Sequence, residues 1–177
     1  MMPAATLRES AVLVPVFRDA AGEITLVLVR RGSHGVHGGQ LAFPGGKRDP
    51  TDASLLATAL RETEEEIGLP ATAIEVLAAL PPVQTRTSGF SIAPFLGRIV
   101  PPARWRFSQP EIAEVLTVPL RHFTGPANAG QELWHFPGEP APELISFWRI
   151  GANHLWGASY RILLPLLPRL LAGEWEL

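Results

Sequence analysis

The segment GGKRDPTDASLLATALRETEEEIGL, residues 45–69, constrains the fold more than any other part of the chain. It predicts a helix from Asp52 to Ile67, capped at its start by Asp49 or Asp52 and ended by Gly68. At about 100° per residue, one side of this helix carries an apolar stripe and another side carries acidic residues. The helix is therefore expected to bury one face against other elements while its acidic face forms a site.

The acidic face consists of Glu62, Glu65 and Glu66, within an arc of roughly 100°. The apolar stripe consists of Leu56, Leu60, Thr63 and Ile67. Like charges four residues apart destabilise a helix by a few tenths of a kcal/mol, and a hard divalent cation such as Mg²⁺ would remove that penalty. Arg61 can pair with Glu65 across one turn. The alternative is an ordinary solvated acidic face, which the glycine pair before the helix and the glycine after it disfavour.

The other patterns indicate a mixture of strands and helices. A β-hairpin is expected from Ala11–Phe17 and Ile24–Arg30, and strands from Gln40–Phe43, Ile74–Leu80, Phe90–Arg98 and Ala113–Val118. A second hairpin is expected from Glu132–Phe136 and Leu144–Ile150, a loop at Ser33–Gly39, and a turn at Pro44–Gly46. A last helix is expected from Leu155 to Leu171, broken or kinked by Pro165 and Pro168. This order favours an α+β fold over a doubly wound sheet, in a single domain over residues 1–177.

Composition excludes several classes of function. The 15 Lys and Arg residues against 17 Asp and Glu residues give a net charge of −2, which argues against a broad basic surface for nucleic acid. The chain has no cysteine, so disulfides, cysteine-rich zinc sites and thiol catalysis are excluded. No apolar run reaches the roughly 18 residues of a membrane span, and the first residues lack a signal-peptide pattern. We therefore expect a cytoplasmic protein with no membrane or nucleic-acid partner; a homodimer is left open.

The stretch RETEEEIGL, residues 61–69, together with Gly46, resembles the Nudix box. The resemblance implies an α/β/α sandwich of the α+β class, whose mixed sheet has the box helix and a C-terminal helix packed on it. It also implies Mg²⁺ or Mn²⁺ bound by Glu62, Glu65 and Glu66, with Gly46 as a backbone ligand, and Arg61 among the catalytic residues. The implied activity is hydrolysis of a nucleoside diphosphate linked to another moiety.

Two departures from the common box refine the resemblance. Asp52 stands where the box usually has Glu, and eight residues instead of seven separate it from Arg61. Thr63 replaces a residue that is usually aliphatic. The one-residue lengthening resembles the coenzyme A diphosphatase subfamily, as do the stretches FPGGKRDPTD and TALRE, which begin at Phe43 and Thr58.

Residues before the box also resemble that subfamily. Counting back from the box, Arg30, His37 and Gly39 match its upstream signature, whereas Arg31 and Gly35 stand at positions that usually hold Ser or Ala and a basic residue. The residues expected to contact substrate are Arg30, Arg31, His37 and Gly39. The alternative for each of these residues is that it does not contact substrate and is only a surface charge or a loop residue. Glu114 is a candidate for an additional metal ligand or water-orienting base, the alternative being a helix or strand cap.

The resemblance implies coenzyme A as substrate, cut to 3′,5′-ADP and 4′-phosphopantetheine. One alternative is another nucleotide diphosphate, such as ADP-ribose or a dinucleoside polyphosphate. A second alternative is a Nudix-fold binding module without turnover, which the three retained carboxylates disfavour.

Overall fold

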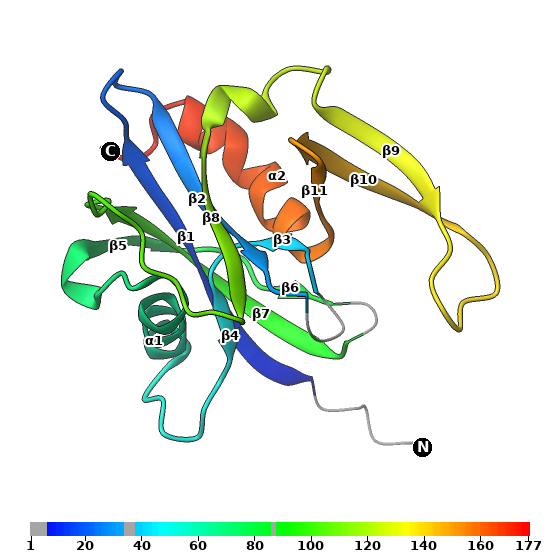
Figure 1. Cartoon of the computed structure of the whole chain (residues 1–177), viewed down its shortest axis with the longest axis horizontal. Helices are drawn as coiled ribbons and strands as arrows, with labels where there is room; N and C mark the ends of the chain where they lie inside the picture. The colour runs from blue at the N-terminus through cyan, green and yellow to red at the C-terminus, as the bar shows by residue number, and fades with distance from the viewer. Residues whose placement is uncertain (1–6, 34–37, 86–87) are drawn as a thin grey trace.

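The computed structural model describes residues 7–33, 38–85 and 88–177, which form two sheets and two α-helices (Figure 1). The larger sheet is mixed, because β1 runs parallel to β7 and antiparallel to β2 and β4. Its strands are β1 Arg8–Arg18, β2 Ile24–Arg31, β3 Leu41–Ala42, β4 Gly45–Lys47, β5 Ile74–Ala79, β6 Val83–Gln84, β7 Phe90–Ile99 and β8 Ile112–Pro119. The predicted pairing of the first two strands is confirmed, with Val16 opposite Leu26.

The smaller sheet and the helices complete the fold. The sheet consists of β9 Ala129–Trp134, β10 Glu143–Ile150 and β11 Asn153–Trp156, and it projects beyond the larger sheet on the side of α2 (Figure 1). The helices are α1 Leu55–Ile67 and α2 Gly157–Leu171, with short 3₁₀ turns at Ala71–Ala73 and Leu120–Phe123. The predicted hairpin of the second sheet is confirmed, since β9 and β10 pair antiparallel.

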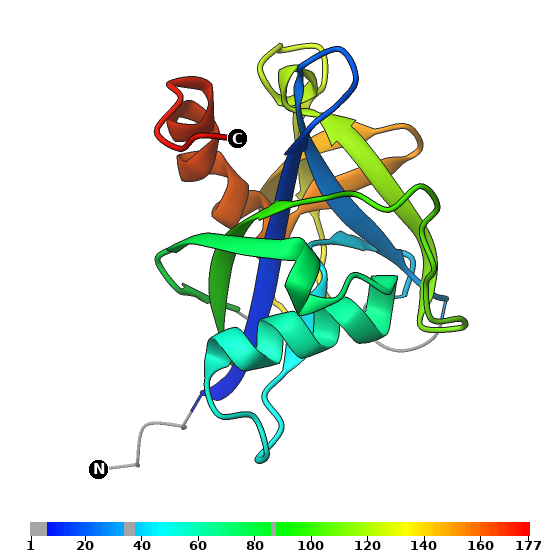
Figure 2. The ribbon, with the colours of Figure 1, turned by 90° about the vertical axis from the view of Figure 1, so that its left-hand side faces the viewer.

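Strand β2 shows how the larger sheet is covered on both faces. Leu26 and Leu28 belong to the buried cluster that includes α2, whereas Val27 and Val29 belong to the cluster that includes Ile67 of α1. Alternate residues of a strand point to opposite faces, so β2 is buried on both sides. Figures 1 and 2 show α1 and α2 on opposite faces of the sheet. The expected sandwich, with the box helix and the C-terminal helix packed on a mixed sheet, is confirmed.

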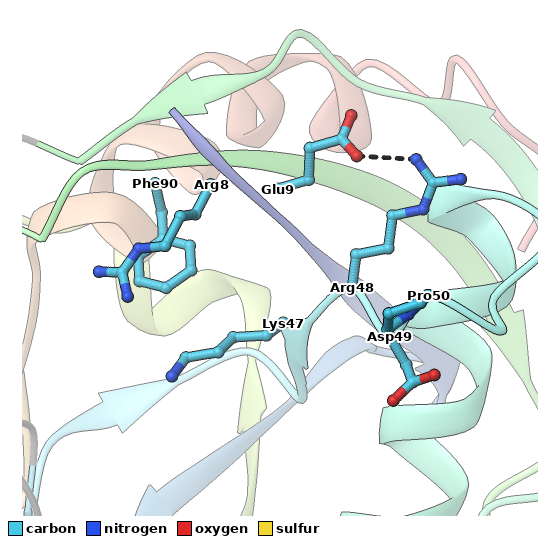
Figure 3. Close-up of a pocket in the computed structure, with 7 residues that line it drawn as sticks. All are labelled: Arg8, Glu9, Lys47, Arg48, Asp49, Pro50 and Phe90. Carbon is cyan, nitrogen blue, oxygen red and sulfur yellow. Dashed lines mark hydrogen bonds and ion pairs between the residues drawn. The ribbon is translucent and has the colours of Figure 1, made fainter. Parts of the chain in front are cut away.

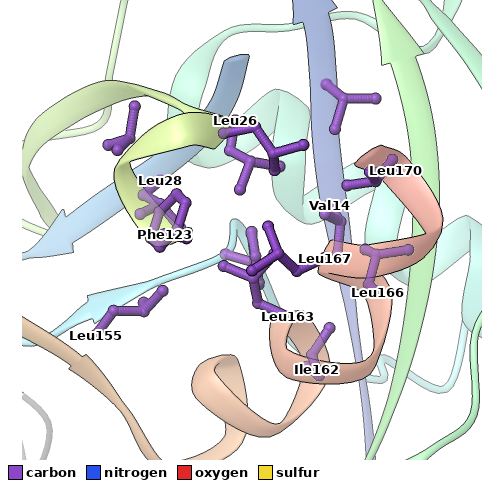
Figure 4. Packing of buried hydrophobic residues seen from close by; sticks show 14 of the residues in the cluster. Val14, Leu26, Leu28, Phe123, Leu155, Ile162, Leu163, Leu166, Leu167 and Leu170 are labelled. Atoms are coloured by element: carbon purple, nitrogen blue, oxygen red, sulfur yellow. The ribbon is translucent and has the colours of Figure 1, made fainter. Parts of the chain in front are cut away.

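The core on the α2 side draws on both sheets. Ile162, Leu163, Leu166 and Leu170 of α2 meet strand residues such as Val14 (Figure 4). The spacing of these four residues gives the helix one continuous apolar stripe. The core therefore fixes where the start of α2 lies relative to the larger sheet.

The predicted break in the C-terminal helix is absent, because α2 continues through Pro165 and Pro168. Both prolines lie on the exposed side of the helix. Because proline has no amide hydrogen, Pro165 leaves the Arg161 carbonyl without its usual donor, and Pro168 does the same to the Leu164 carbonyl. Arg161 and Leu164 are exposed as well. Those carbonyls can be solvated by water. The helix also begins later than Leu155, because the chain up to Trp156 pairs with β10 as the extra strand β11.

Two local predictions near the box are also wrong. The residues expected to form a turn at Pro44–Gly46 instead include strand β4, which pairs with β1 and places Gly46 opposite Ala11. The helix cap is Ser54, whose hydroxyl accepts a hydrogen bond from the Ala57 amide at 3.1 Å, and not Asp49 or Asp52.

The end of the helix at Gly68 and the strands β3, β5, β7 and β8 are confirmed. Part of the predicted loop at Ser33–Gly39, residues 34–37, lies outside the described residues. No helix in the described ranges is long and apolar enough to span a membrane. A single domain over residues 1–177 stays a prediction.

Candidate functional site: an acidic helix beside a glycine pair

Helix α1 is held against the sheet by a face of small and apolar side chains. Thr58, Ala59, Thr63 and Ile67 are buried, and the Thr63 hydroxyl donates to the Ala59 carbonyl at 2.7 Å. A hydroxyl satisfied within its own helix can replace an aliphatic residue without leaving an unpaired polar group in the core. Leu56 and Leu60 of the expected stripe are only partly buried. The buried face is therefore rotated relative to the prediction, and Glu66 belongs to it.

Glu66 is the most deeply buried carboxylate of the site, with 3% of its surface exposed. Its Oε2 accepts a hydrogen bond from the Gly45 amide at 3.0 Å, and its Oε1 lies 4.0 Å from a guanidinium nitrogen of Arg31. Burial raises the pKa of Glu66 to about 7, and the Gly45 hydrogen bond and the Arg31 charge only partly oppose this rise. The carboxyl therefore titrates near neutral pH in the absence of a bound cation.

Glu62 lies directly against the backbone of Gly46. A Cβ at position 46 would come within 2.6 Å of both carboxylate oxygens of Glu62, so a side chain there would displace the carboxylate. Partial burial raises the pKa of Glu62, and the nearby charges of Glu65 and Glu111 act in the same direction. Glycine at position 46 thus allows the Glu62 carboxylate to approach the backbone of β4 this closely.

Arg61 connects the acidic residues into one network. Its Nε and Nη2 donate to the two Asp52 oxygens at 2.9 Å each, and its Nη1 donates to Glu62 at 3.0 Å and to Glu65 at 3.1 Å. Its Nη2 also donates to the Lys47 carbonyl at 3.2 Å. The predicted pairing of Arg61 with Glu65 is confirmed. The guanidinium neutralises part of the charge on α1 and fixes two of its carboxylates relative to β4.

Asp52, the residue that departs from the common box, anchors this arginine. It is buried, and it also accepts hydrogen bonds from the Thr58 hydroxyl at 2.8 Å and from the Asp49 amide at 2.9 Å. These partners, Arg61 first, hold the pKa of Asp52 well below its usual range. Asp52 therefore remains charged and holds Arg61 in its bidentate position.

The two arginines at the end of β2 face different partners. Arg30 pairs with Glu114, its direct neighbour on β8, at 3.1 Å, whereas Arg31 faces Glu66. Successive residues of a strand point to opposite faces, so one of the two can face Glu66 while the other does not. The structure brings Arg31 to the acidic site and leaves Arg30 in an ion pair beside it.

Glu111 is the acidic residue that the sequence prediction did not select. Its charge contributes to the raised pKa of both Glu62 and Glu66, whereas Glu114 is paired with Arg30. The Gly32 amide donates to the Glu111 carbonyl at 2.8 Å, which places this residue beside the end of β2. The sequence PEIAEV, residues 110–115, contains both glutamates. The register of β8 on β2 distinguishes them, because it places Glu114 opposite Arg30.

The remaining predicted residues, His37 and Gly39, follow β2 in the sequence. Gly39 adopts a φ of 76°, in the left-handed region that glycine tolerates, and its amide donates to the carbonyls of Arg31 and Gly32 at 3.1 Å each. Gly39 thus shapes the backbone that follows Arg31. His37 lies outside the described residues.

The chemistry of the acidic residues suits a divalent cation. Glu62, Glu65 and Glu66 offer carboxylate oxygens, the ligands that Mg²⁺ and Mn²⁺ prefer, and Glu66 is a buried carboxylate with a single hydrogen-bond donor. In the described ranges, no group of three or more acidic or histidine side chains is already arranged to hold a metal ion. Arg61 holds Glu62 and Glu65 in this arrangement. The carboxylate oxygens therefore fit a divalent cation. The position of Arg61 determines where the side chains of Glu62 and Glu65 lie relative to each other.

A cleft of about 620 Å³ opens beside the acidic site. Arg31, Gly45 and Gly46 form part of its wall, so it reaches the residues that contact Glu62 and Glu66. Further lining comes from β10, from Trp156 at the end of β11 and from the start of α2, including Tyr160. A cavity large enough for a nucleotide-sized molecule therefore lies beside β4, the strand that Glu62 and Glu66 contact.

Comparison with known protein families supports the resemblance seen in the sequence. Residues 7–136 match the family described as NUDIX domain. Proteins named uncharacterized Nudix hydrolase NudL, from Salmonella paratyphi B and Salmonella newport among others, are 47% identical over 114 residues. These matches cover 64% of this chain and 58% of each relative, so the chain matches less than two thirds of the relatives' length.

Solved structures share the fold at low sequence identity. A MutT/nudix family protein from Enterococcus faecalis superposes with a TM-score of 0.65 at 18% identity, covering 97% of this chain and 65% of that one. A Nudix hydrolase from M. smegmatis, RenU, superposes with a TM-score of 0.56 at 22% identity, covering 66% of this chain and 73% of that one. An Ap4A hydrolase from C. elegans superposes with a TM-score of 0.54 at 22% identity, covering 65% of this chain and 82% of that one. These similarities establish the fold.

The buried carboxyl of Glu66 predicts a specific dependence of stability on pH in protein freed of metal with a chelator. Its pKa is about 7 in the folded protein against an ordinary 4.5, so the folded state binds this proton more tightly than the unfolded state does. The stabilisation is complete below pH 4.5 and is lost as the pH rises through 7. At about 1.4 kcal/mol per pKa unit, the loss amounts to at most about 3.5 kcal/mol.

Urea unfolding of the wild type and of Glu66→Gln at several pH values between 4.5 and 8 measures this effect. The wild type should lose free energy of unfolding relative to the variant as the pH rises, because the glutamine does not titrate. A constant difference across this range would contradict the assignment of the raised pKa to Glu66.

Proposed function

The chain belongs to the Nudix family, and we propose that it hydrolyses a nucleoside diphosphate linked to another moiety, with coenzyme A as substrate and Mg²⁺ or Mn²⁺ as cofactor. The observation that carries this proposal is the position of Glu62 and Glu66 against Gly46 and Gly45, at the wall of the cleft. Carboxylates that contact the strand lining a nucleotide-sized cavity can bring a hard cation to a phosphate group.

Glu62, Glu65 and Glu66 would hold the cation, with the Gly46 carbonyl as a backbone ligand. When bound there, such a cation would lower the pKa of a water molecule and neutralise charge that develops on the phosphate. Glu66 supplies an oxygen that the core already shields from water, which strengthens its attraction for a cation. Arg61 acts as a positioning residue, because it fixes Glu62 and Glu65 while Asp52 fixes Arg61.

Arg31 is the arginine best placed to bind the phosphate oxygens of the substrate. It lines the cleft, whereas Arg30 is neutralised by Glu114. Arg30 at the end of β2 stays in the proposal as a substrate-binding residue, as do His37 and Gly39, which follow β2 in the sequence. Glu114 stays a proposed additional ligand or water-orienting base, and Glu111 joins the proposal as a further acidic residue whose charge acts on Glu62 and Glu66.

Coenzyme A is favoured by the one-residue lengthening of the box, together with the stretches FPGGKRDPTD and TALRE. The structure supports a function for the lengthened segment, since Asp52 within it anchors Arg61. The alternative substrates are ADP-ribose and other nucleotide diphosphates, because Arg31 and Gly35 depart from the upstream signature. A cytoplasmic location accords with the choice of a nucleotide substrate and remains part of the proposal.

Replacing the acidic residues tests the proposed metal site. Glu65→Gln and Glu66→Gln should each lower kcat by about a hundredfold or more, because each removes a charged oxygen that would neutralise and orient the cation. Glu64→Gln is the matched control, since Glu64 is an exposed glutamate of the same helix outside the network of Arg61. Turnover is measured with coenzyme A and Mg²⁺ or Mn²⁺. Near-normal turnover in both Glu65→Gln and Glu66→Gln would contradict the metal assignment.

A panel of coenzyme A, ADP-ribose, NADH and dinucleoside polyphosphates tests the substrate. With Mg²⁺ or Mn²⁺ present, the highest kcat/KM should belong to coenzyme A, with 3′,5′-ADP and 4′-phosphopantetheine as products. A tenfold or larger preference for ADP-ribose, on the order of 1.4 kcal/mol, would replace coenzyme A as the proposed substrate. Binding of the nucleotides without turnover of any would instead support a non-catalytic module.

A further inference from the structure

A second, smaller cavity of about 410 Å³ lies beside the start of β1 and is lined by several charged residues (Figure 3). Two cations in it lie near the same aromatic ring. The Arg8 guanidinium carbon is 4.2 Å from the centre of the Phe90 ring, and the Lys47 ammonium is 5.7 Å from it. Both head groups extend away from the ion pair between Glu9 and Arg48 (Figure 3).

The strand register gathers these residues from three strands. Arg8 is the direct partner of Phe90 across the parallel pair of β1 and β7, and Ser10 is the partner of Lys47 across the antiparallel pair of β1 and β4. The first residues of β1 therefore lie between the strands that carry the ring and the second cation. The cluster is a product of the main sheet and does not depend on a single surface loop.

The two cations lack the acidic partners that neighbouring arginines have. Arg48 pairs with Glu9 at 2.7 Å, whereas in residues 7–33, 38–85 and 88–177 neither Arg8 nor Lys47 forms an ion pair. One Arg8 nitrogen donates to the Ser88 carbonyl at 2.7 Å, which anchors the guanidinium and leaves its other donors for a ligand. Two like charges near one ring repel each other, and an anion between them would remove that repulsion.

Lys47 links this cluster to the acidic site. It directly follows Gly46, against which Glu62 packs, and its carbonyl accepts a hydrogen bond from Arg61. Lys47 and Phe90 also line the cleft of about 620 Å³. A molecule that occupies the cleft and reaches past Phe90 would therefore meet Arg8 and Lys47.

We propose that Arg8 and Lys47, beside Phe90, form a binding site for a second anionic group of the substrate, a phosphate monoester separate from the diphosphate that is cut. The inference rests on the proposed function, since it concerns the same bound substrate. In coenzyme A the group with this chemistry is the 3′-phosphate. The site would select substrates that carry such a phosphate over those that lack it, through charge-assisted hydrogen bonds from the guanidinium and the ammonium.

Two substrates that differ only in this group test the proposal: coenzyme A and 3′-dephospho-coenzyme A. In the wild type, the KM for coenzyme A should be about fivefold to tenfold lower than the KM for 3′-dephospho-coenzyme A. This is the range expected for two exposed charge pairs acting together. In the double variant Arg8→Gln and Lys47→Gln the two KM values should become equal, because no positive charge then distinguishes the 3′-phosphate. Raising the ionic strength should weaken the preference of the wild type in the same way.

Arg48→Gln is the matched control. It also removes a positive charge from this cavity, but the charge of Arg48 is already paired with Glu9. It should keep the wild-type ratio of the two KM values. Equal KM values in the wild type, or a ratio that the double variant preserves, would overturn the second anion site. Loss of the ratio in Arg48→Gln as well would overturn the assignment to Arg8 and Lys47.

A failure of the proposed function gives a different result. If neither substrate is hydrolysed, calorimetric binding of 3′,5′-ADP and of AMP still tests the site, because these probes differ by the same phosphate. The wild type should bind 3′,5′-ADP about fivefold to tenfold more tightly, and the double variant should bind both equally. Equal affinities in the wild type would overturn the proposal independently of turnover.

Discussion

The concentration of negative charge on α1 is the constraint to which much of the surrounding structure responds. Carboxylates one turn apart repel each other, and burial makes their charged forms still less favourable. Arg61 offsets part of this cost for Glu62 and Glu65, and Asp52 holds Arg61 in place. Burial raises the pKa of Glu66 to about 7, because Arg61 does not contact it and its one backbone donor and a distant arginine oppose only part of the rise. The uncompensated charge is the physical reason to expect a cation.

Local patterns predicted the parts of the fold that local forces determine. Gly68 ends α1 in the left-handed conformation that glycine favours, and the first hairpin follows from two apolar runs separated by a short polar turn. The pairing of Arg61 with Glu65 follows from helix geometry alone. The burial of Glu66 could not be predicted in this way, because it depends on how the helix is rotated against the sheet. The same limitation explains the error in the apolar stripe.

Pairing between distant segments accounts for the other differences. Strand β4 forms only because β1 lies beside Gly45 and Gly46, and β11 forms because β10 is available to pair with it. The choice between Glu111 and Glu114 depends on the register of β8 against β2, which no local pattern encodes. The wall of the cleft formed by β10 and α2 lies beyond residue 136, where the family match ends. The box therefore predicts the chemistry, whereas distant segments shape the cavity in which a substrate would be selected.

The central claim is that Glu62, Glu65 and Glu66 together bind a divalent cation, and Mn²⁺ titration followed by electron paramagnetic resonance tests it most directly. The signal of free Mn²⁺ reports binding at pH 7.5 without any nucleotide or turnover. The wild type should bind Mn²⁺ saturably, and a variant with all three residues changed to glutamine should lose this binding while remaining folded, because its neutral side chains no longer offer charged oxygens. Equal Mn²⁺ binding by the wild type and the triple variant would contradict the account.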